Sequence, residues 1–277
     1  MILVDKNGAK ICELEPETDL LSETSWFRLY RSRTFDGKQS YLLRVPTDEC
    51  YNGEINLEAV MLAHFEDWSN STESDYSKAK GDPNARIHYD WLFPKLVGSF
   101  LTGEDQAFRQ VNLLSVRDAL VEDFVPMVKL MEKYKVDAKT GAWILGRFYK
   151  LQTFLEDCGG LYNFNVDGVI LEPRMHRMVY LGFPCSGELC DWDKSVRNAT
   201  SVILDWIEND GTEHEEDFRG LLEWTCDENN GRKWSGTDAH CIFYKQLDVW
   251  WGHKYHPFTY MNRETGEWQT ITETPKF

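Results

Sequence analysis

Long hydrophobic runs are missing from this sequence of 277 residues. No stretch reaches the roughly 18 consecutive apolar residues that a helix needs to cross a membrane. The first residues also lack the basic start, apolar core and small-residue cleavage site of a secretory signal peptide. We therefore expect a cytoplasmic protein without a membrane-spanning segment.

Basic residues are scarce: 30 Lys and Arg stand against 46 Asp and Glu, for a formal net charge of −16. Nucleic-acid binders generally show the opposite balance, because Lys and Arg neutralise the phosphates. The composition therefore argues against direct nucleic-acid binding. Three roles for the acidic surface stay open: solubility, docking on a basic partner, and imitation of DNA.

Signatures of disulfides and of metal sites are also missing. The seven cysteines are odd in number and widely scattered, at positions 12, 50, 158, 185, 190, 226 and 241. Without a secretory signal, this pattern indicates reduced thiols. Cys185 and Cys190 do not have the spacing of a zinc knuckle. We expect neither a metal nor another cofactor.

What the sequence does contain is ample material for a core, with 42% hydrophobic and 14% aromatic residues. The length allows one large domain or two lobes. Alternating apolar runs and turn signals predict strands in the first part. The expected strands are residues 2–4, 10–14, 26–30, 40–45, 96–101 and 106–114, with a hairpin turn at Asp36-Gly37.

One helix is expected among these strands, from Ile55 to about Phe65. Its apolar face is predicted from helical spacing to comprise Leu57, Val60, Met61, His64 and Phe65. The polar stretch 69–86 follows and contains Gly81, Asp82-Pro83 and Asn84. We expect it to be an exposed loop.

The second part of the chain is mostly helical. Periodic apolar residues predict helices at 121–134, 137–157, 191–208, 215–226 and 238–251, with a β-hairpin around 169–181. Asp137 fits an N-cap and Gly159-Gly160 a C-cap of the second helix. The segregated order predicts an α+β fold. The expected parts are an N-terminal strand segment (1–25), a β-rich lobe (26–116) and a helical lobe with a tail (117–277).

This order resembles the protein-kinase fold, with a small β-rich N-lobe carrying one helix and a larger helical C-lobe. Tyr41-Leu42-Leu43-Arg44 looks like the strand that carries the ATP-binding lysine, with Arg44 in its place. Glu58 lies where the family places the helix glutamate that pairs with this lysine. Residues 93–100 and 143–155 resemble the strand before the hinge and the helix before the catalytic loop. The resemblance covers roughly residues 26 to 262 and makes Arg44 and Glu58 the remnant of a nucleotide cleft.

The groups that perform the family's chemistry are absent. Aligned on Val169-Ile170-Leu171, Asn163 takes the position of the catalytic Asp, Gly168 that of the magnesium-binding Asn, and Leu181 that of the Asp in Asp-Phe-Gly. Phosphoryl transfer needs a lysine, metal ligands and a base, and glycine and leucine offer magnesium no oxygen ligand. A glycine-rich loop and a long activation segment are also missing. The resemblance therefore implies a pseudokinase without catalytic residues.

The C-terminal part is similar to a narrower group, bacterial kinase-like proteins often labelled DnaJ-class chaperones. The similarity lies in Phe218-Arg219-Gly220-Leu221-Leu222, in Asn230-Gly231-Arg232, and in the segment from Leu247 through His256-Pro257-Phe258-Thr259. This resemblance implies that Arg232 is a buried structural arginine paired with a carboxylate.

Several other positions can be interpreted either as functional or as structural. An alignment shift by one residue would give Asp167 a metal-binding role, although Asp167-Gly168 also suits a turn. Asn163 and Asn165 fit loop hydrogen bonds to the backbone. His253 and His256 are metal or catalytic candidates, or part of a packed terminal segment. The acidic residues at positions 205, 208, 210, 213, 215, 216 and 217 form a solvated face or a docking site.

The leading functional hypothesis is a pseudokinase that acts as a binding, scaffold or regulatory module through a protein partner. The first alternative is an atypical nucleotide-binding enzyme, such as an unusual kinase or nucleotidyl transferase, that reuses the kinase cleft. The second is an acidic phage-type inhibitor or decoy of a nucleic-acid enzyme. The eleven tryptophans and the divergence from the kinase pattern also suggest a phage protein.

Overall fold

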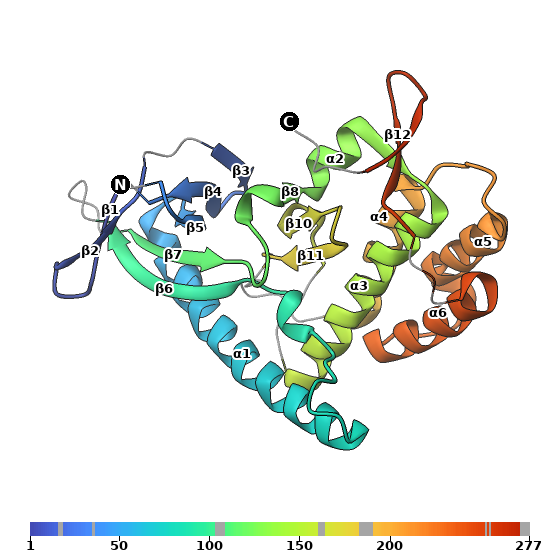
Figure 1. The fold of residues 1–277 in the computed structure, drawn as a ribbon, viewed down its shortest axis with the longest axis horizontal. Coiled ribbons are helices and arrows are strands. Elements are labelled where there is room, and N and C mark those ends of the chain that lie inside the picture. The colour runs from blue at the N-terminus through green and yellow to red at the C-terminus, as the bar shows by residue number, and fades with distance from the viewer. Residues whose placement is uncertain are drawn as a thin grey trace. The chain divides into compact units, whose positions relative to one another are not determined.

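The computed structural model describes residues 1–15, 19–34, 37–102, 109–159, 164–182, 191–252, 254 and 256–271. The chain divides into two compact units (Figure 1). Unit 1 comprises Met1–Phe124 and Val179–Ser186, and unit 2 comprises Val125–Met178 and Gly187–Phe277. The mixed α+β class is confirmed, with a large β-sheet in the N-terminal part and mostly helices in the C-terminal part.

Unit 1 is built on an antiparallel seven-stranded sheet in the order β2-β1-β6-β7-β5-β4-β3. Its strands are β1 Ile2–Val4, β2 Lys10–Glu13, β3 Asp19–Glu23, β4 Phe27–Arg33, β5 Ser40–Pro46, β6 Lys95–Thr102 and β7 Gln110–Ser115. The predicted hairpin of β4 and β5 is confirmed, because Phe27 to Arg33 pair in order with Pro46 to Ser40. Strand β3 was not predicted.

The two faces of this sheet are covered differently. Helix α1 (Asn52–Lys80) packs on β5, β6 and β7, as Figure 1 shows. A separate apolar cluster is formed by Leu3, Leu14, Tyr30, Leu43, Val45, Val111 and Leu113. Along β5, side chains alternate between the two faces, so Leu43 and Val45 of this cluster alternate with Leu42 and Arg44.

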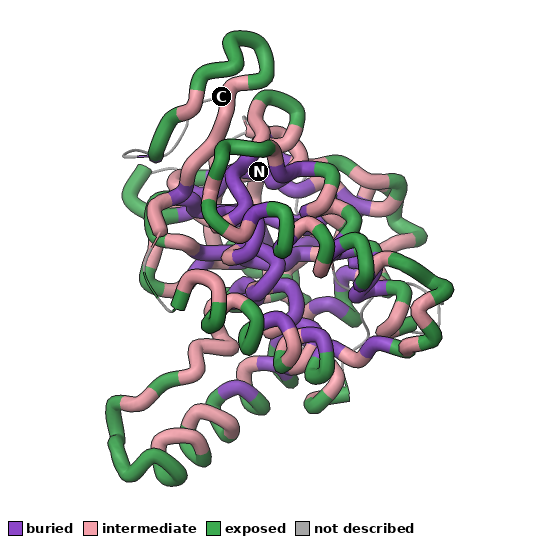
Figure 2. The backbone as a smooth tube through the Cα atoms, turned by 90° about the vertical axis from the view of Figure 1, so that its right-hand side faces the viewer, coloured by how far each residue is buried: buried purple, intermediate pink, exposed green. Residues whose placement is uncertain are grey.

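The loop prediction for 69–86 is wrong over its first part, because α1 continues without a break to Lys80 and ends at Gly81, whose φ is +65°. Ser69 is the last buried residue of α1, and the rest of the helix is exposed or intermediate in burial (Figure 2). The Glu73 carboxylate accepts hydrogen bonds from the backbone nitrogens of Ile87 and His88. These hydrogen bonds hold the segment that follows α1 against the helix.

The predicted apolar face of α1 is also partly wrong. Met61 and Phe65 are buried, but Leu57 and Val60 are exposed, and so is His64. The buried face instead comprises Ile55, Glu58, Met61, Leu62, Phe65 and Ser69. This buried face includes the carboxylate of Glu58, which a pattern of apolar residues does not select.

Unit 2 is built around helix α3 (Ala138–Cys158), which packs against α4 and α6. The other helices are α2 Met127–Lys133, α4 Trp192–Trp206, α5 Glu215–Cys226 and α6 Gly236–Trp251. The predicted caps of α3 are confirmed: the Asp137 carboxylate accepts from the Thr140 nitrogen at 2.8 Å, and Gly159 ends the helix with φ +71°. The single helix predicted for 121–134 is wrong, because strand β8 (Val125–Pro126) interrupts it.

Two three-stranded sheets complete the fold, in the orders β11-β10-β8 and β13-β12-β9. Their remaining strands are β9 Tyr134–Val136, β10 Val169–Glu172, β11 Arg177–Tyr180, β12 Thr259–Asn262 and β13 Trp268–Thr270. Single 3-10 turns occur at η1 Glu49–Tyr51, η2 Tyr89–Trp91, η3 Val121–Asp123, η4 Val166–Gly168 and η5 Glu228–Asn230. Within the described ranges, no helix combines the length and apolar character needed to cross a membrane.

Candidate functional site

The candidate site lies in unit 1, where β5 and α1 face one another. Arg44 is the fifth residue of β5 and pairs with Leu29 of β4 and Asn112 of β7 across the sheet. Glu58 lies in the second turn of α1, on its buried face. Both side chains have 0% exposure, and Arg44 Nε lies 2.9 Å from Glu58 Oε1. The structure therefore joins these two predicted residues in a fully buried ion pair.

The rest of the Arg44 guanidinium is also occupied. Its Nη2 donates a hydrogen bond to the backbone carbonyl of Leu181. The ring of Phe27 lies over the guanidinium at 4.0 Å, and that of Trp26 at 5.7 Å. Aromatic faces attract such a cation, more strongly when it is desolvated. Arg44 is thus held by an anion, a carbonyl and two rings, and none of its surface is accessible.

Asn112 completes the network and was not predicted. Its Nδ2 donates to Glu58 Oε2 and to the carbonyl of Ile55, both at 2.8 Å, and its Oδ1 accepts from Ser99 Oγ at 2.7 Å. A signal was present in the sequence, because Asn112 interrupts the apolar run Val111–Leu114. A polar residue inside a buried strand needs a partner.

Burial dominates the electrostatics of the pair. Loss of water raises the pKa of the Glu58 carboxyl, and the charge of Arg44 and the Asn112 hydrogen bond partly offset this. Burial likewise lowers the pKa of the Arg44 guanidinium, opposed by the Glu58 charge. Each charge offsets part of the cost of burying the other, so removal of one partner destabilises the charge that remains.

The positions predicted to have lost their chemistry fall in three places. Leu181 belongs to unit 1, is 1% exposed, and contributes only its carbonyl to Arg44. Gly168 belongs to unit 2 and is buried in η4. Asn163 lies outside the described residues. The prediction for Asn165 is confirmed, because its side chain accepts from the Asp167 nitrogen at 3.0 Å. Among the described residues, no three His, Cys, Asp or Glu side chains gather as metal ligands would.

Of the two terminal histidines, the structure describes His256. His256 Nε2 lies 2.5 Å from Asp137 Oδ2, and the other carboxylate oxygen of Asp137 caps α3. Phe258 is buried, with its ring 6.2 Å from that of Trp143. The terminal segment is packed as the second interpretation expects, but these contacts are with α3, whereas packing on the last helix was expected. His253 lies outside the described residues.

The assignment of Arg232 as the buried arginine is wrong. Its side chain is 36% exposed and lies 3.8 Å from Asp238. The buried arginine of this region is Arg197 of α4, whose Nε pairs with Asp193 at 2.9 Å. Its two terminal nitrogens donate to the carbonyls of Thr225, Asp227 and Arg232 at 2.7–3.0 Å.

The acidic cluster is not uniformly solvated. Glu215 is 4% exposed, and its Oε2 accepts from the backbone nitrogens of Asp210 and Gly211 at 3.2 and 3.3 Å. It therefore fixes the turn before α5. The exposed members are Asp205, Asp210, Glu213, Glu216 and Asp217. The described cysteines, at positions 12, 50, 158, 226 and 241, are free thiols.

No protein-family model matches the chain, and no curated protein matches it. What the site can do must therefore follow from its own geometry.

Proposed function

We propose that the chain is a degenerate protein-kinase-like protein, a pseudokinase, similar to the bacterial kinase-like proteins labelled DnaJ-class chaperones. It acts as a binding or regulatory module through protein–protein interaction and does not transfer phosphoryl groups. The order of elements in unit 1 supports the kinase-like part of this proposal. In protein kinases, the phosphate-binding lysine on the third strand pairs with a glutamate of the following helix. Here β3, β4 and β5 follow in sequence, and Arg44 of β5 pairs with Glu58 of α1.

The burial of Arg44 is the observation that carries the non-catalytic part. A residue that neutralises ATP phosphates must present its charge to the ligand. The guanidinium of Arg44 has no exposed surface and is bound by Glu58 and the Leu181 carbonyl. Breaking a buried ion pair costs about 3–5 kcal/mol. An incoming phosphate would have to offset that loss before it gained any affinity.

The missing metal ligands support the same conclusion. Magnesium in these active sites is held by carboxylate and amide oxygens. Leu181 and Gly168, at the aligned positions, have no side-chain oxygen. Even if Arg44 moved to contact a phosphate, these positions would offer no ligands for the magnesium ions that neutralise the transferred group.

A phosphoryl-transfer assay tests the enzymatic half of the proposal. The protein is incubated with ATP labelled at the γ-phosphate, magnesium or manganese, and a generic protein substrate. We expect no transfer above that seen without protein. Metal-dependent transfer that disappears in Arg44→Met would contradict the proposal, and Lys10→Gln serves as a charge-matched control on the exposed surface.

The partner is proposed to be a basic protein in the cytoplasm. The net charge of −16 and the exposed acids before and within α5 favour a basic surface. The scattered, odd number of cysteines supports the compartment. Capture from a lysate should weaken between about 0.05 and 0.5 M salt. It should weaken likewise when Glu213, Glu216 and Asp217 are changed to their amides. Capture unaffected by both changes would contradict a basic partner at this surface.

A further inference from the structure

Helices α3 and α6 of unit 2 bring together several unused hydrogen-bond donors. Trp143 and Arg147 lie four residues apart on α3, and therefore on one face of the helix. Tyr244 comes from α6, which packs closely on α3. At the contact, a Cβ on Gly146 would lie 3.6 Å from the Tyr244 hydroxyl oxygen. This hydroxyl therefore lies beside the residue that precedes Arg147.

Among the described residues, Arg147 lacks the carboxylate partner that two other arginines of low exposure have. Arg44 and Arg197 pair with the carboxylates of Glu58 and Asp193. Within the described residues, Arg147 has no hydrogen bond and no ion pair. Burial nevertheless lowers the pKa of its guanidinium, and the nearby Tyr244 partly opposes this. A desolvated cation without an anion is costly, and it stands out in a chain with a net charge of −16.

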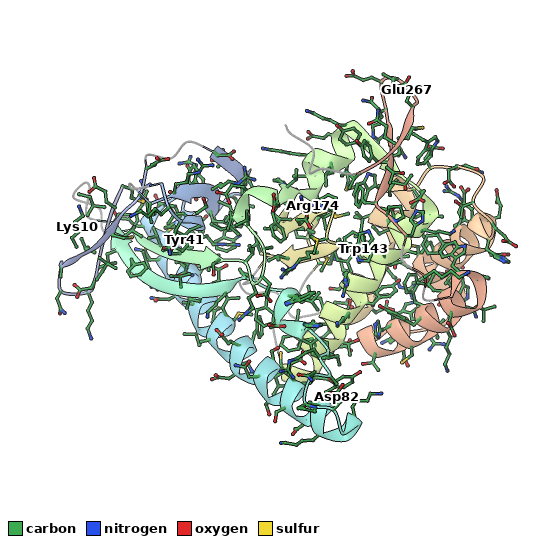
Figure 3. The ribbon with its side chains drawn as sticks, in the orientation of Figure 1. Lys10, Tyr41, Asp82, Trp143, Arg174 and Glu267 are labelled. Carbon is green, nitrogen blue, oxygen red and sulfur yellow. The ribbon has the colours of Figure 1, made fainter. Side chains whose placement is uncertain are left out.

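The charge of Arg147 acts on its neighbour His176. Burial lowers the pKa of His176 to about 4, and the charges of Arg147 and His256 lower it further. The His176 ring lies 4.7 Å from the ring of Trp143. Figure 3 labels Trp143 on α3, near the β10–β11 hairpin that carries His176. An anion placed here would meet an attractive potential.

Two further donors come from neighbouring positions, one turn before Arg147 on α3 and beside Gly146. The indole Nε1 of Trp143 is buried and has no acceptor in the part of the chain that the structure describes. The Tyr244 hydroxyl has no hydrogen-bond partner among the described residues, and the side chain is 37% exposed. The Trp143 ring contacts the rings of His176 and Phe258, with centroids 4.7 and 6.2 Å away. Buried donors without partners are rare in folded proteins and call for an explanation.

We propose that Arg147, Trp143 and Tyr244 form a binding site for an oxyanion, the phosphate, sulfate or carboxylate group of a ligand. The guanidinium supplies the charge and a planar pair of donors that match such a group. The indole N–H and the phenolic O–H supply single donors beside it. The proposal concerns unit 2 alone and does not depend on the function proposed for the Arg44 pair in unit 1.

Nuclear magnetic resonance of the Trp143 indole N–H tests the site directly. Trp143→Phe assigns the signal, and the protein is titrated with phosphate, sulfate or acetate at constant ionic strength, with chloride as the reference. We expect a saturable shift with at least one oxyanion and none with chloride. Phosphate and sulfate alone would define a tetrahedral ligand, and acetate in addition would extend the site to carboxylates.

Variants decide whether Arg147 carries the binding. Arg147→Met should weaken the affinity about tenfold or more, and Tyr244→Phe about threefold to tenfold. Lys245→Gln, which removes an exposed charge from the same helix as Tyr244, should leave it unchanged. No saturable shift, an equal shift with chloride, or unchanged affinity in Arg147→Met would overturn the proposal.

Thermal unfolding separates a binding role from a structural one. Without an oxyanion, Arg147→Met should unfold at the same temperature as the wild type or higher, because it removes a desolvated charge and keeps the aliphatic stem. Phosphate should raise the midpoint of the wild type and of Lys245→Gln, but not that of Arg147→Met. A lower midpoint for Arg147→Met together with an unchanged response to phosphate would assign the residue to structure alone.

Discussion

Removal of one partner from the buried Arg44–Glu58 pair should destabilise unit 1 strongly. In Glu58→Gln, the Arg44 guanidinium keeps the Leu181 carbonyl and the Phe27 ring but loses its counter-charge at 2.9 Å. An uncompensated charge buried in this way costs about 3–5 kcal/mol. Arg44→Met should cost a similar amount at neutral pH, because Glu58 is then left with Asn112 alone.

The pH dependence of Arg44→Met follows from the same geometry. Without Arg44, burial raises the pKa of Glu58 above its value in the unfolded chain even further. A group with a raised pKa contributes stability below its unfolded pKa and loses it as pH rises through the folded one. Arg44→Met should therefore be less destabilised at pH 5 than at pH 8, whereas Glu58→Gln should show no such recovery.

The double variant Arg44→Met/Glu58→Leu distinguishes the energy of the ion pair from that of the other contacts of the two side chains. It removes both charges and leaves the Leu181 carbonyl without its donor, which costs about 1–3 kcal/mol. Asn112 keeps Ile55 and Ser99 as partners. The free-energy losses of the two single variants sum to roughly 6–10 kcal/mol. The double variant should lose much less than this sum, which would show a favourable coupling between Arg44 and Glu58.

Urea unfolding followed by tryptophan fluorescence measures these free energies through the midpoint and slope. Glu13→Gln is the control, because the exposed Lys10–Glu13 pair should contribute nothing measurable. A loss of less than about 1 kcal/mol in Glu58→Gln, or additive losses in the two single variants, would show that the two charges do not stabilise one another.

Three further predictions concern five substitutions in unit 2. His176→Asn should make stability less sensitive to acid: the pKa of His176 is lowered to about 4, so the wild type loses stability as pH falls below about 6.5. After solvent screening this loss is about 1 kcal/mol, and unfolding midpoints at pH 7.5 and 5 measure it. Arg197→Met should cost about 3–5 kcal/mol and Arg232→Met less than about 1 kcal/mol, and equal losses in urea would contradict the assignment of Arg197 as the buried arginine. Gly236→Ala should cost about 1–3 kcal/mol because its Cβ would lie 2.7 Å from a backbone nitrogen, whereas Gly220→Ala meets open space within α5 and should stabilise by about 0.5–1 kcal/mol. A thermal melt in which Gly236→Ala is the more stable variant would refute this reading.

The elements that sequence predicts well are those defined by local chemistry. Helix α3 has an aspartate at its start, a glycine at its end and a regular apolar face, so its bounds follow from capping and periodicity. The β4–β5 hairpin follows from two apolar runs around a glycine turn. Arg44 and Glu58 could be chosen because the resemblance to kinases directs attention to that strand and helix.

The elements that sequence misses depend on contacts made far along the chain. The second half of α1 carries few apolar residues, and it is held by the hydrogen bonds from Ile87 and His88 to Glu73. Strand β8 has two residues and exists only through its pairing with β10. The exchange of roles between Arg232 and Arg197 has the same cause, because the burial of an arginine is decided by which carbonyls surround it in the fold.

Nucleotide binding is the most direct test of the claim that Arg44 is withdrawn from chemistry. Isothermal calorimetry with ATP, with and without magnesium, is performed on the wild type and on Glu58→Gln, which frees Arg44 from its anion. We expect no saturable heat for the wild type under either condition. Saturable, magnesium-dependent binding to the wild type that Arg44→Met abolishes would contradict it, because Arg44 would then serve as a phosphate ligand.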